Sequence, residues 1–348
     1  MRESLLEVLV DPVSKGRLRV EATRAEGGEI IEGWLRGDGG RGYAIAVGIP
    51  RFVLTEDEGQ RQTEGSFGFK WRQRYSYESE EFAGGYHRWL RQKYGFASDE
   101  EMRDFFCRKR RTLEVGCGGG LSASVSLSCG GQGQEWVGVD ISRAVEIARD
   151  RLGHMRGAHF VQADILQLPF RERSFDAIFA EGVLHHTPST ELALKSLCPL
   201  LAAGGEIMFY VYRKKGPVRE FTDDYVRGLV SGLPPQEAWE MLLPLTRLGQ
   251  ALAELRAEVE VPEDIPYLGI KAGRHDVQRL IYWHFAKMFW NPDYPFETNH
   301  HINFDWYHPR YAHRQTEEEV RRWCGEAGLS VVHLDEQESG FTVRAVKE

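Results

Sequence analysis

The 348-residue sequence lacks the features that would make it a membrane or secreted protein. No stretch approaches the roughly twenty consecutive apolar residues that a membrane-spanning helix needs. The segment Met1 to Leu5 has no charged and apolar signal-peptide layout. We therefore expect a cytoplasmic protein without a membrane partner.

Cysteine and net positive charge are also scarce. The five cysteines include no C-x-x-C pair, so we expect reduced thiols, no disulfide framework and no metal site. The formal net charge is -8, and nucleic-acid phosphates are normally bound by a net basic surface. This balance argues against a nucleic-acid partner, unless a local basic patch exists.

A run of glycines lies between two predicted strands. Residues 112–115 form an apolar strand, Gly116 to Gly120 form a glycine loop, and residues 136–139 form a second strand that leads to Asp140. Glycines let a backbone approach a ligand closely, and a carboxylate at the next strand end can take both ribose hydroxyls. The stretch predicts a site for a cofactor that carries a nucleoside.

Strands and helices alternate after this stretch. Further strands are expected at 159–162, 175–180 and 206–212, with a helix running to Leu201 and stopped by Gly204 and Gly205. Such alternation predicts a parallel sheet with helices on both faces. The capping box Thr316 to Glu319 opens a last helix, and two final strands around a tight connection pair antiparallel.

The glycine loop also fits the dinucleotide pattern G-x-G-x-x-A, so other residues must decide. Glu114, just before the loop, suits an ammonium group and would repel a pyrophosphate. Asp164, after the third strand, can accept a hydrogen bond from the adenine amine, and Ile165 offers an apolar contact to the ring. These features favour a cofactor with an amino-acid part.

Four segments, 113–120, 137–140, 162–164 and 174–186, resemble the successive motifs of class I S-adenosylmethionine-dependent methyltransferases, most closely the ubiquinone/menaquinone-biosynthesis-like group. The resemblance implies S-adenosyl-L-methionine as cofactor and S-adenosyl-L-homocysteine as product. It places the glycine loop beside the methionine part, Asp140 at the ribose and Asp164 at the adenine. The candidate cofactor-binding residues are Glu114, Gly116, Cys117, Gly118, Gly120, Asp140, Ile141, Asp164, Ile165, Glu181, Gly182 and His185.

The fold class follows from the alternation and the resemblance together. We expect an α/β protein with a Rossmann-like seven-stranded sheet and an antiparallel last strand, plus a small N-terminal β-rich module and a helical lid insertion. The predicted divisions are 1–57, a small module; 58–101, an aromatic helical linker or cap; 102–215 with 304–348, the methyltransferase domain; and 216–303, the substrate-selecting lid. The polar residues 56–62 are expected to form a linker.

The first module resembles the small zinc-ribbon-like proteins that activate methyltransferases. Asp11 and Ser14 replace the two cysteines of that pattern, which implies a version without metal; an unrelated small β-module is the alternative. The aromatic residues after Ser66 suit a helix over the ligand mouth, and equally suit burial against the main domain.

Catalytic and substrate-binding candidates come from the strand ends and the lid. The sulfonium methyl is already activated, so no metal is required, and His185 or His186 is the candidate for a proton-accepting base, with Tyr212 beside them. Both histidines are equally compatible with no catalytic duty. The substrate-binding candidates are Arg213, Arg219, Tyr282, His301 and Tyr307. The arginines fit a carboxylate or phosphate, or a solvated basic turn.

Together these residues predict a methyltransferase that acts on O, N or C of a small-molecule metabolite, as a monomer or homodimer. Two alternatives stay open. One is an RNA or protein methyltransferase, suggested by the activator-like module. The other is an atypical S-adenosylmethionine-binding protein.

Overall fold

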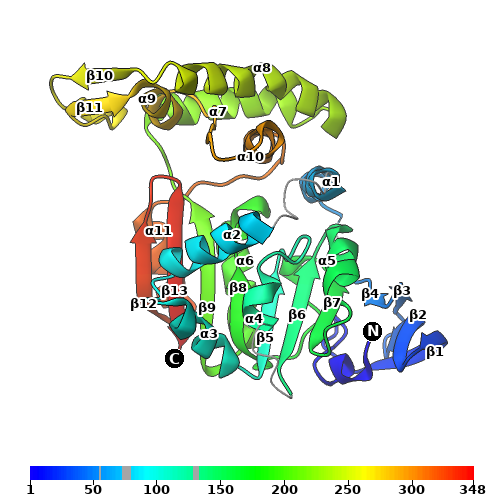
Figure 1. The fold of residues 1–348 in the computed structure, drawn as a ribbon. Helices are drawn as coiled ribbons and strands as arrows, with labels where there is room; N and C mark the ends of the chain where they lie inside the picture. The colour runs from blue at the N-terminus through cyan, green and yellow to red at the C-terminus, as the bar shows by residue number, and fades with distance from the viewer. Residues whose placement is uncertain (55, 73–79, 128–132) are drawn as a thin grey trace.

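The computed structural model describes residues 1–54, 56–72, 80–127 and 133–348, and Figure 1 shows a central sheet with a helical layer above it. The seven strands run in the order β12-β13-β9-β8-β5-β6-β7. Their bounds are β5 Arg111–Val115, β6 Glu135–Asp140, β7 Ala158–Gln162, β8 Phe175–Ala180, β9 Leu201–Tyr212, β12 Leu329–Glu336 and β13 Gly340–Lys347. Strands β5 to β9 pair in parallel, while β13 is antiparallel to β9 and β12. The predicted fold class is confirmed.

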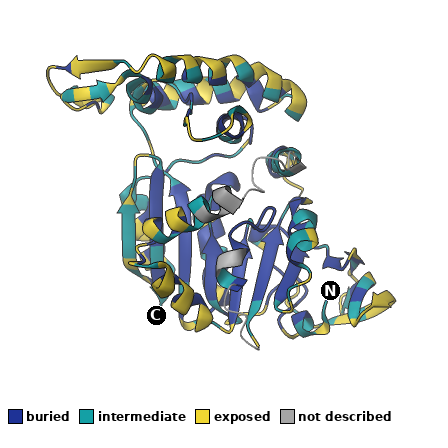
Figure 2. Cartoon of the chain, in the orientation of Figure 1, coloured by how far each residue is buried: buried dark blue, intermediate teal, exposed yellow. Residues whose placement is uncertain are grey.

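Helices pack on both faces of the sheet, so its central strands are buried along their whole length. Every residue of β5 and β7 is buried, and Figure 2 shows the central strands in the colour of buried residues. The packed helices are α3 Asp99–Cys107, α4 Ala123–Leu127, α5 Ala144–Leu152, α6 Thr190–Leu197 and α11 Glu317–Glu326. The capping box between Thr316 and Glu319 opens α11 as predicted.

The fifth strand begins earlier than the sequence suggested. Helix α6 ends at Leu197, a short 3-10 turn follows, and β9 starts at Leu201. The prediction that Gly204 stops a helix here was wrong. Gly204 has a φ of 69°, and the pairing of β8 with β9 shifts register between Phe175 and Ala177. The glycine therefore belongs to an irregularity within the strand.

The N-terminal module is a four-stranded antiparallel sheet that packs on the main domain. It contains β1 Leu18–Glu26, β2 Glu29–Gly37, β3 Gly42–Ala46 and β4 Ile49–Pro50, after a 3-10 turn at Glu3–Glu7. The amide of Phe52 donates to the Gln162 carbonyl at 2.7 Å, and Phe52 shares one apolar cluster with Phe170. The Asp11 carboxylate accepts hydrogen bonds from two loop amides and from the Tyr43 hydroxyl at 3.0 Å. Asp11 thus ties its loop to the sheet.

A roof of helices lies above the strand ends. It consists of α1 Glu58–Arg72 and α2 Glu80–Lys93, followed much later by the lid, α7 Pro217–Val230, α8 Pro235–Glu254, the hairpin of β10 Glu258–Val261 and β11 Gly273–Asp276, α9 Val277–His284 and α10 Phe296–Tyr307. The linker predicted at 56–62 was wrong, because α1 begins at Glu58. The hairpin was not predicted, and α10 runs past the predicted lid border at 303. No helix of the described residues is long and apolar enough to cross a membrane.

The cysteines are only partly as expected. Cys117, Cys198 and Cys324 are free and buried. Cys107, at the end of α3, is disulfide-bonded, so the expectation of reduced thiols is wrong for this residue. Spacing rules detect pairs that are close in sequence, and the chain has no such pair.

Candidate active site

A cavity of about 510 Å³ lies at the carboxyl ends of the parallel strands, under the roof of helices. This is the edge where open α/β sheets bind their ligands. Nine of the residues predicted from the sequence line it: Gly116, Cys117, Asp140, Ile141, Ile165, Glu181, Gly182, His186 and Tyr212. The ends of β5, β6, β8 and β9 and the turn after β7 therefore converge on one site.

Asp140, the last residue of β6, is held in a fixed orientation. One carboxylate oxygen accepts from the Gly118 amide at 2.9 Å, and the other accepts from the amide and hydroxyl of Ser142 at 2.8 and 2.7 Å. Burial raises the carboxyl's pKa, while these hydrogen bonds oppose the shift. A carboxylate offers about four acceptor positions and three of them are used here, so Asp140 keeps about one for a ligand hydroxyl.

Glu114 lies behind the cavity wall. Its carboxylate accepts from the Ser122 hydroxyl and, at 2.9 Å, from the indole of Trp136. Burial raises its pKa to about 7. The structure thus places Glu114 in a buried internal network, and it does not bring Gly118, Gly120 or Asp164 to the cavity lining.

Glu181, directly after β8, is held by the roof. Lys93 forms an ion pair with one carboxylate oxygen, and the Tyr94 hydroxyl donates to the other at 2.5 Å. The Lys93 ammonium also lies over the Tyr210 and Trp89 rings, 3.4 and 4.0 Å from their centroids. Burial lowers the pKa of Lys93 to about 8. The end of α2 is therefore tied to the cofactor side of the cavity.

The two adjacent histidines differ in position. His186 lines the cavity, and its Nδ1 lies 2.7 Å from the Tyr311 carbonyl. A carbonyl only accepts, so Nδ1 carries the proton and the lone pair of the neutral ring is on Nε2. Burial lowers its pKa to about 3. His185 does not line the cavity; it is fully buried with its ring centroid 3.7 Å from that of Tyr212.

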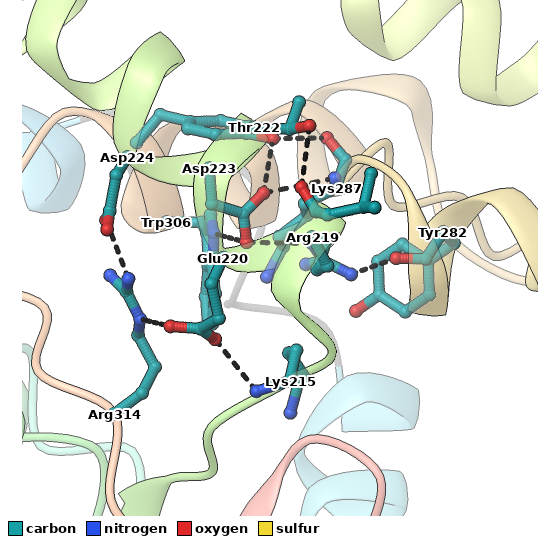
Figure 3. Close-up of polar contacts among 12 residues, drawn as sticks. Lys215, Arg219, Glu220, Thr222, Asp223, Asp224, Tyr282, Lys287, Trp306 and Arg314 are labelled. Carbon is teal, nitrogen blue, oxygen red and sulfur yellow. Dashed lines mark hydrogen bonds and ion pairs between the residues drawn. The ribbon is translucent and has the colours of Figure 1, made fainter. Parts of the chain in front are cut away.

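Most of the predicted substrate-binding residues lie in or beside the lid's interior. Arg219 is 1% exposed, bonds Asp223 at 2.7 Å and donates to the Tyr282 carbonyl (Figure 3). The Tyr307 hydroxyl donates to the same carboxylate at 3.0 Å. Arg213 pairs with Glu336. The structure does not bring any of these residues, or His301, to the cavity lining.

The aromatic segment was expected to suit a helix over the ligand mouth, and Phe67 and Trp71 of α1 do line the cavity. Sequence reasoning missed Gln60 and Thr63 on the same face, and Thr298, Ile302 and Asp305 of α10, which also line it. The spacings of three, four and four on α1, and of four and three on α10, each define one face of a helix. This periodicity is readable in the sequence. The cavity-facing residues of α1, however, include both polar and aromatic side chains, and the sequence prediction divided them between a linker and an aromatic segment.

Comparisons with known proteins match the part of the chain that carries the strand ends. Residues 113–209 match the family described as "Methyltransferase domain". They form a class I S-adenosylmethionine-dependent methyltransferase domain. The chain is similar to "Probable tRNA methyltransferase 9B" of Mus musculus, 36% identical over 111 residues, which are 31% of this chain and 23% of that protein. It is also similar to a malonyl-[acyl-carrier protein] O-methyltransferase of Legionella pneumophila, 35% identical over 29% of this chain and 35% of that protein.

Among solved structures, the magnesium protoporphyrin IX methyltransferase (ChlM) of Synechocystis PCC 6803 with bound SAH has a TM-score of 0.43 and 13% identity, covering 83% of this chain and 98% of that one. The alignments with the tRNA methyltransferase 9B and with the malonyl-[acyl-carrier protein] O-methyltransferase span about a quarter to a third of the length of those two proteins. The family match, residues 113–209, lies within the methyltransferase domain and does not include α1, α2 or the lid.

The cofactor of the domain is S-adenosylmethionine, and the residues present fit it. Gly116 borders the cavity with a φ of 68°, and a Cβ added there would lie 2.6 Å from the Val183 side chain. Only glycine fits this cradle. The Asp140 carboxylate suits ribose hydroxyls, and Ile141 and Ile165 offer apolar contacts to a base.

Proposed function

We propose that the protein transfers the methyl group of S-adenosylmethionine to a small, uncharged acceptor molecule. The supporting observation is that one cavity extends from the cofactor residues of the methyltransferase domain to α1, α2 and the lid helix α10. A shared cavity can bring cofactor and acceptor into contact and exclude water, which is how orientation lowers the barrier of a transfer reaction.

In this proposal the chain's own groups bind and orient, while the bound cofactor supplies an activated methyl group. Asp140 holds the ribose, and the backbone at Gly116 allows close approach of the methionine part. Nε2 of His186 is the group on the cavity wall that can take a proton from the acceptor. Its low pKa makes it a weak base, so acceptors that lose their proton readily are favoured.

The charges on the cavity wall favour an acceptor without phosphate or carboxylate. Among the described lining residues, Lys70 is the one lysine or arginine, and it forms an ion pair with Asp305 of α10. Glu181 is likewise paired with Lys93. The rest of the inner surface is largely aromatic, with Phe67, Trp71, Tyr86, Trp89, Tyr210, Tyr212 and Tyr294. Such a lining suits a flat or apolar body.

RNA is the second candidate, because of the similarity to a protein named as a tRNA methyltransferase. The similarity covers 31% of this chain and 23% of that protein, and the paired charges on the cavity wall favour an uncharged small molecule. A nucleotide acceptor would require a positive surface for its phosphates.

The deciding experiment uses S-adenosylmethionine labelled in the methyl group. Purified protein is incubated with a metabolite extract or with total RNA, and label is followed in each fraction. We expect label in small molecules and none in RNA. Label in RNA would replace the first candidate with the second. Absence of cofactor binding by calorimetry would refute the proposed function altogether.

A further inference from the structure

Two buried polar side chains of α1 face the cavity without a hydrogen-bond partner. Gln60 is 3% exposed and Thr63 is 2% exposed. Gln60 Oε1 and Thr63 Oγ1 have no partner among the described residues, and both side chains line the cavity. A buried polar atom without a partner is costly, so a natural explanation is a ligand that supplies the missing bonds.

The neighbouring face of α1 is anchored to the chain after the lid. Gln62 donates to the His308 carbonyl at 3.0 Å and accepts from the Arg310 amide at 2.7 Å. Ser66 lies 2.8 Å from Nδ1 of His308. These bonds fix the rotation of the helix, so the orientation of Gln60 and Thr63 toward the cavity is held from outside.

This part of α1 covers the half of the site where Asp140 lies. The charge of Asp140 contributes to raising the pKa of Glu64, after the larger effect of burial. A Cβ added to Gly118 would lie 2.3 Å from the Trp71 ring, so α1 also covers the glycine loop. Helix α1 contacts α5, the helix that follows Asp140 (Figure 1).

We propose that Gln60 and Thr63 hydrogen-bond the adenosine part of S-adenosylmethionine, an inference that rests on the proposed function. An amide oxygen and a hydroxyl are neutral groups. They can bond the amine, ring nitrogens and hydroxyls of a nucleoside, and their helix contacts α5, which follows the proposed ribose ligand Asp140. Helix α1 is thereby a further element of the cofactor site, beyond the strand ends.

The test is calorimetric titration of Thr63→Val and Gln60→Met with S-adenosylmethionine and with methylthioadenosine, which lacks the amino-acid part. Each variant removes one ligand hydrogen bond with little change of shape, so each should bind both ligands about tenfold more weakly. The thermal midpoint of the free protein should stay level or rise, because the atoms removed have no partner there.

Thr222→Val is the matched control. The Thr222 hydroxyl lies on lid helix α7 and donates to the Val218 carbonyl at 2.9 Å. Its removal should leave both affinities unchanged. Wild-type affinity in Thr63→Val and Gln60→Met would overturn the inference, as would a loss seen with S-adenosylmethionine alone or a matching fall in the thermal midpoint. A wild-type protein that binds neither ligand would instead refute the proposed function.

Discussion

The cofactor half and the lid half of this molecule are built in different ways. In the cofactor half, the end of β6 and the loop after β8 deliver Asp140, Glu181 and His186 to one cavity, on a sheet whose core is apolar. In the lid, the buried carboxylate of Asp223 accepts bonds from Arg219 and Trp306 at 2.7 and 2.8 Å (Figure 3), and from Tyr307 at 3.0 Å. The first half depends on sequence-local motifs, and the second on a buried polar network that joins α7 to α10.

The largest effect should come from breaking that network. Arg219→Met leaves the Asp223 carboxylate, which is 0% exposed, without its cation. Removing one partner of a buried pair costs about 3–5 kcal/mol. We expect hydrogen exchange of α7 and α10 to accelerate strongly, while amides of β5 to β8 keep their protection. Cofactor affinity should change little.

An exposed pair of the same spacing provides the control. Arg321 and Glu317 also lie four residues apart on a helix, 2.6 Å from each other, with 53% and 34% of their side chains exposed. Arg321→Met should cost less than about 0.5 kcal/mol. An equal cost for the two arginine variants would mean that burial does not set the strength of the lid network.

The next prediction concerns a substitution in the cofactor half. Asp140→Ala removes the carboxylate proposed to hold the ribose, and one hydrogen bond to a charged group is worth about 1.5–3 kcal/mol. Binding of S-adenosylmethionine should weaken about 10- to 100-fold in calorimetry. Exchange of the lid amides should stay at wild-type rates. Unchanged binding would remove Asp140 from the site.

The two halves should also respond to pH in opposite directions. Burial raises the pKa of Glu114 to about 7, so the folded state holds a proton that the unfolded state has lost. Its contribution to stability is therefore lost as pH rises from about 4.5 to 7. Burial lowers the pKa of Lys287 in the lid to about 7. The contribution of Lys287 to stability is lost as pH falls from about 10.5 to 7.

Each of these groups changes stability by at most about 1.4 kcal/mol per pH unit. Glu114→Gln should flatten the pH dependence of exchange in β5 between pH 4.5 and 7. Lys287→Met should flatten that of α10 between pH 7 and 10. Lys271→Met, which removes a lysine with 83% of its side chain exposed, is the control for the lid. The same pH slope in Lys287→Met as in wild type would refute the attribution of this pH dependence to Lys287.

The contrast between the two halves explains which parts of the fold and of the site could be predicted from the sequence. Five parallel strands and the final antiparallel pair were readable because short segments rich in apolar and β-branched residues are bounded by glycines or acids. Asp140 ends one such strand, and Glu181 directly follows another. The positions of Arg219, Tyr282 and Tyr307 could not be predicted from the sequence. An arginine or tyrosine buried in a polar network is the same residue type as one that binds a ligand. Gln60 and Thr63 were missed because a polar helix start resembles a linker.

The smallest expected effect concerns the lid's own contact with the acceptor. Thr298 on α10 is 2% exposed, lines the cavity, and its hydroxyl has no partner among the described residues. It lies in the half proposed to cover the acceptor, so Thr298→Val should raise the acceptor's KM by about five- to tenfold and leave calorimetric affinity for S-adenosylmethionine unchanged. Thr63→Val should show the reverse pattern. If both variants weakened cofactor binding alike, the division of the cavity between α1 and α10 would be wrong, and the lid would belong to the cofactor site.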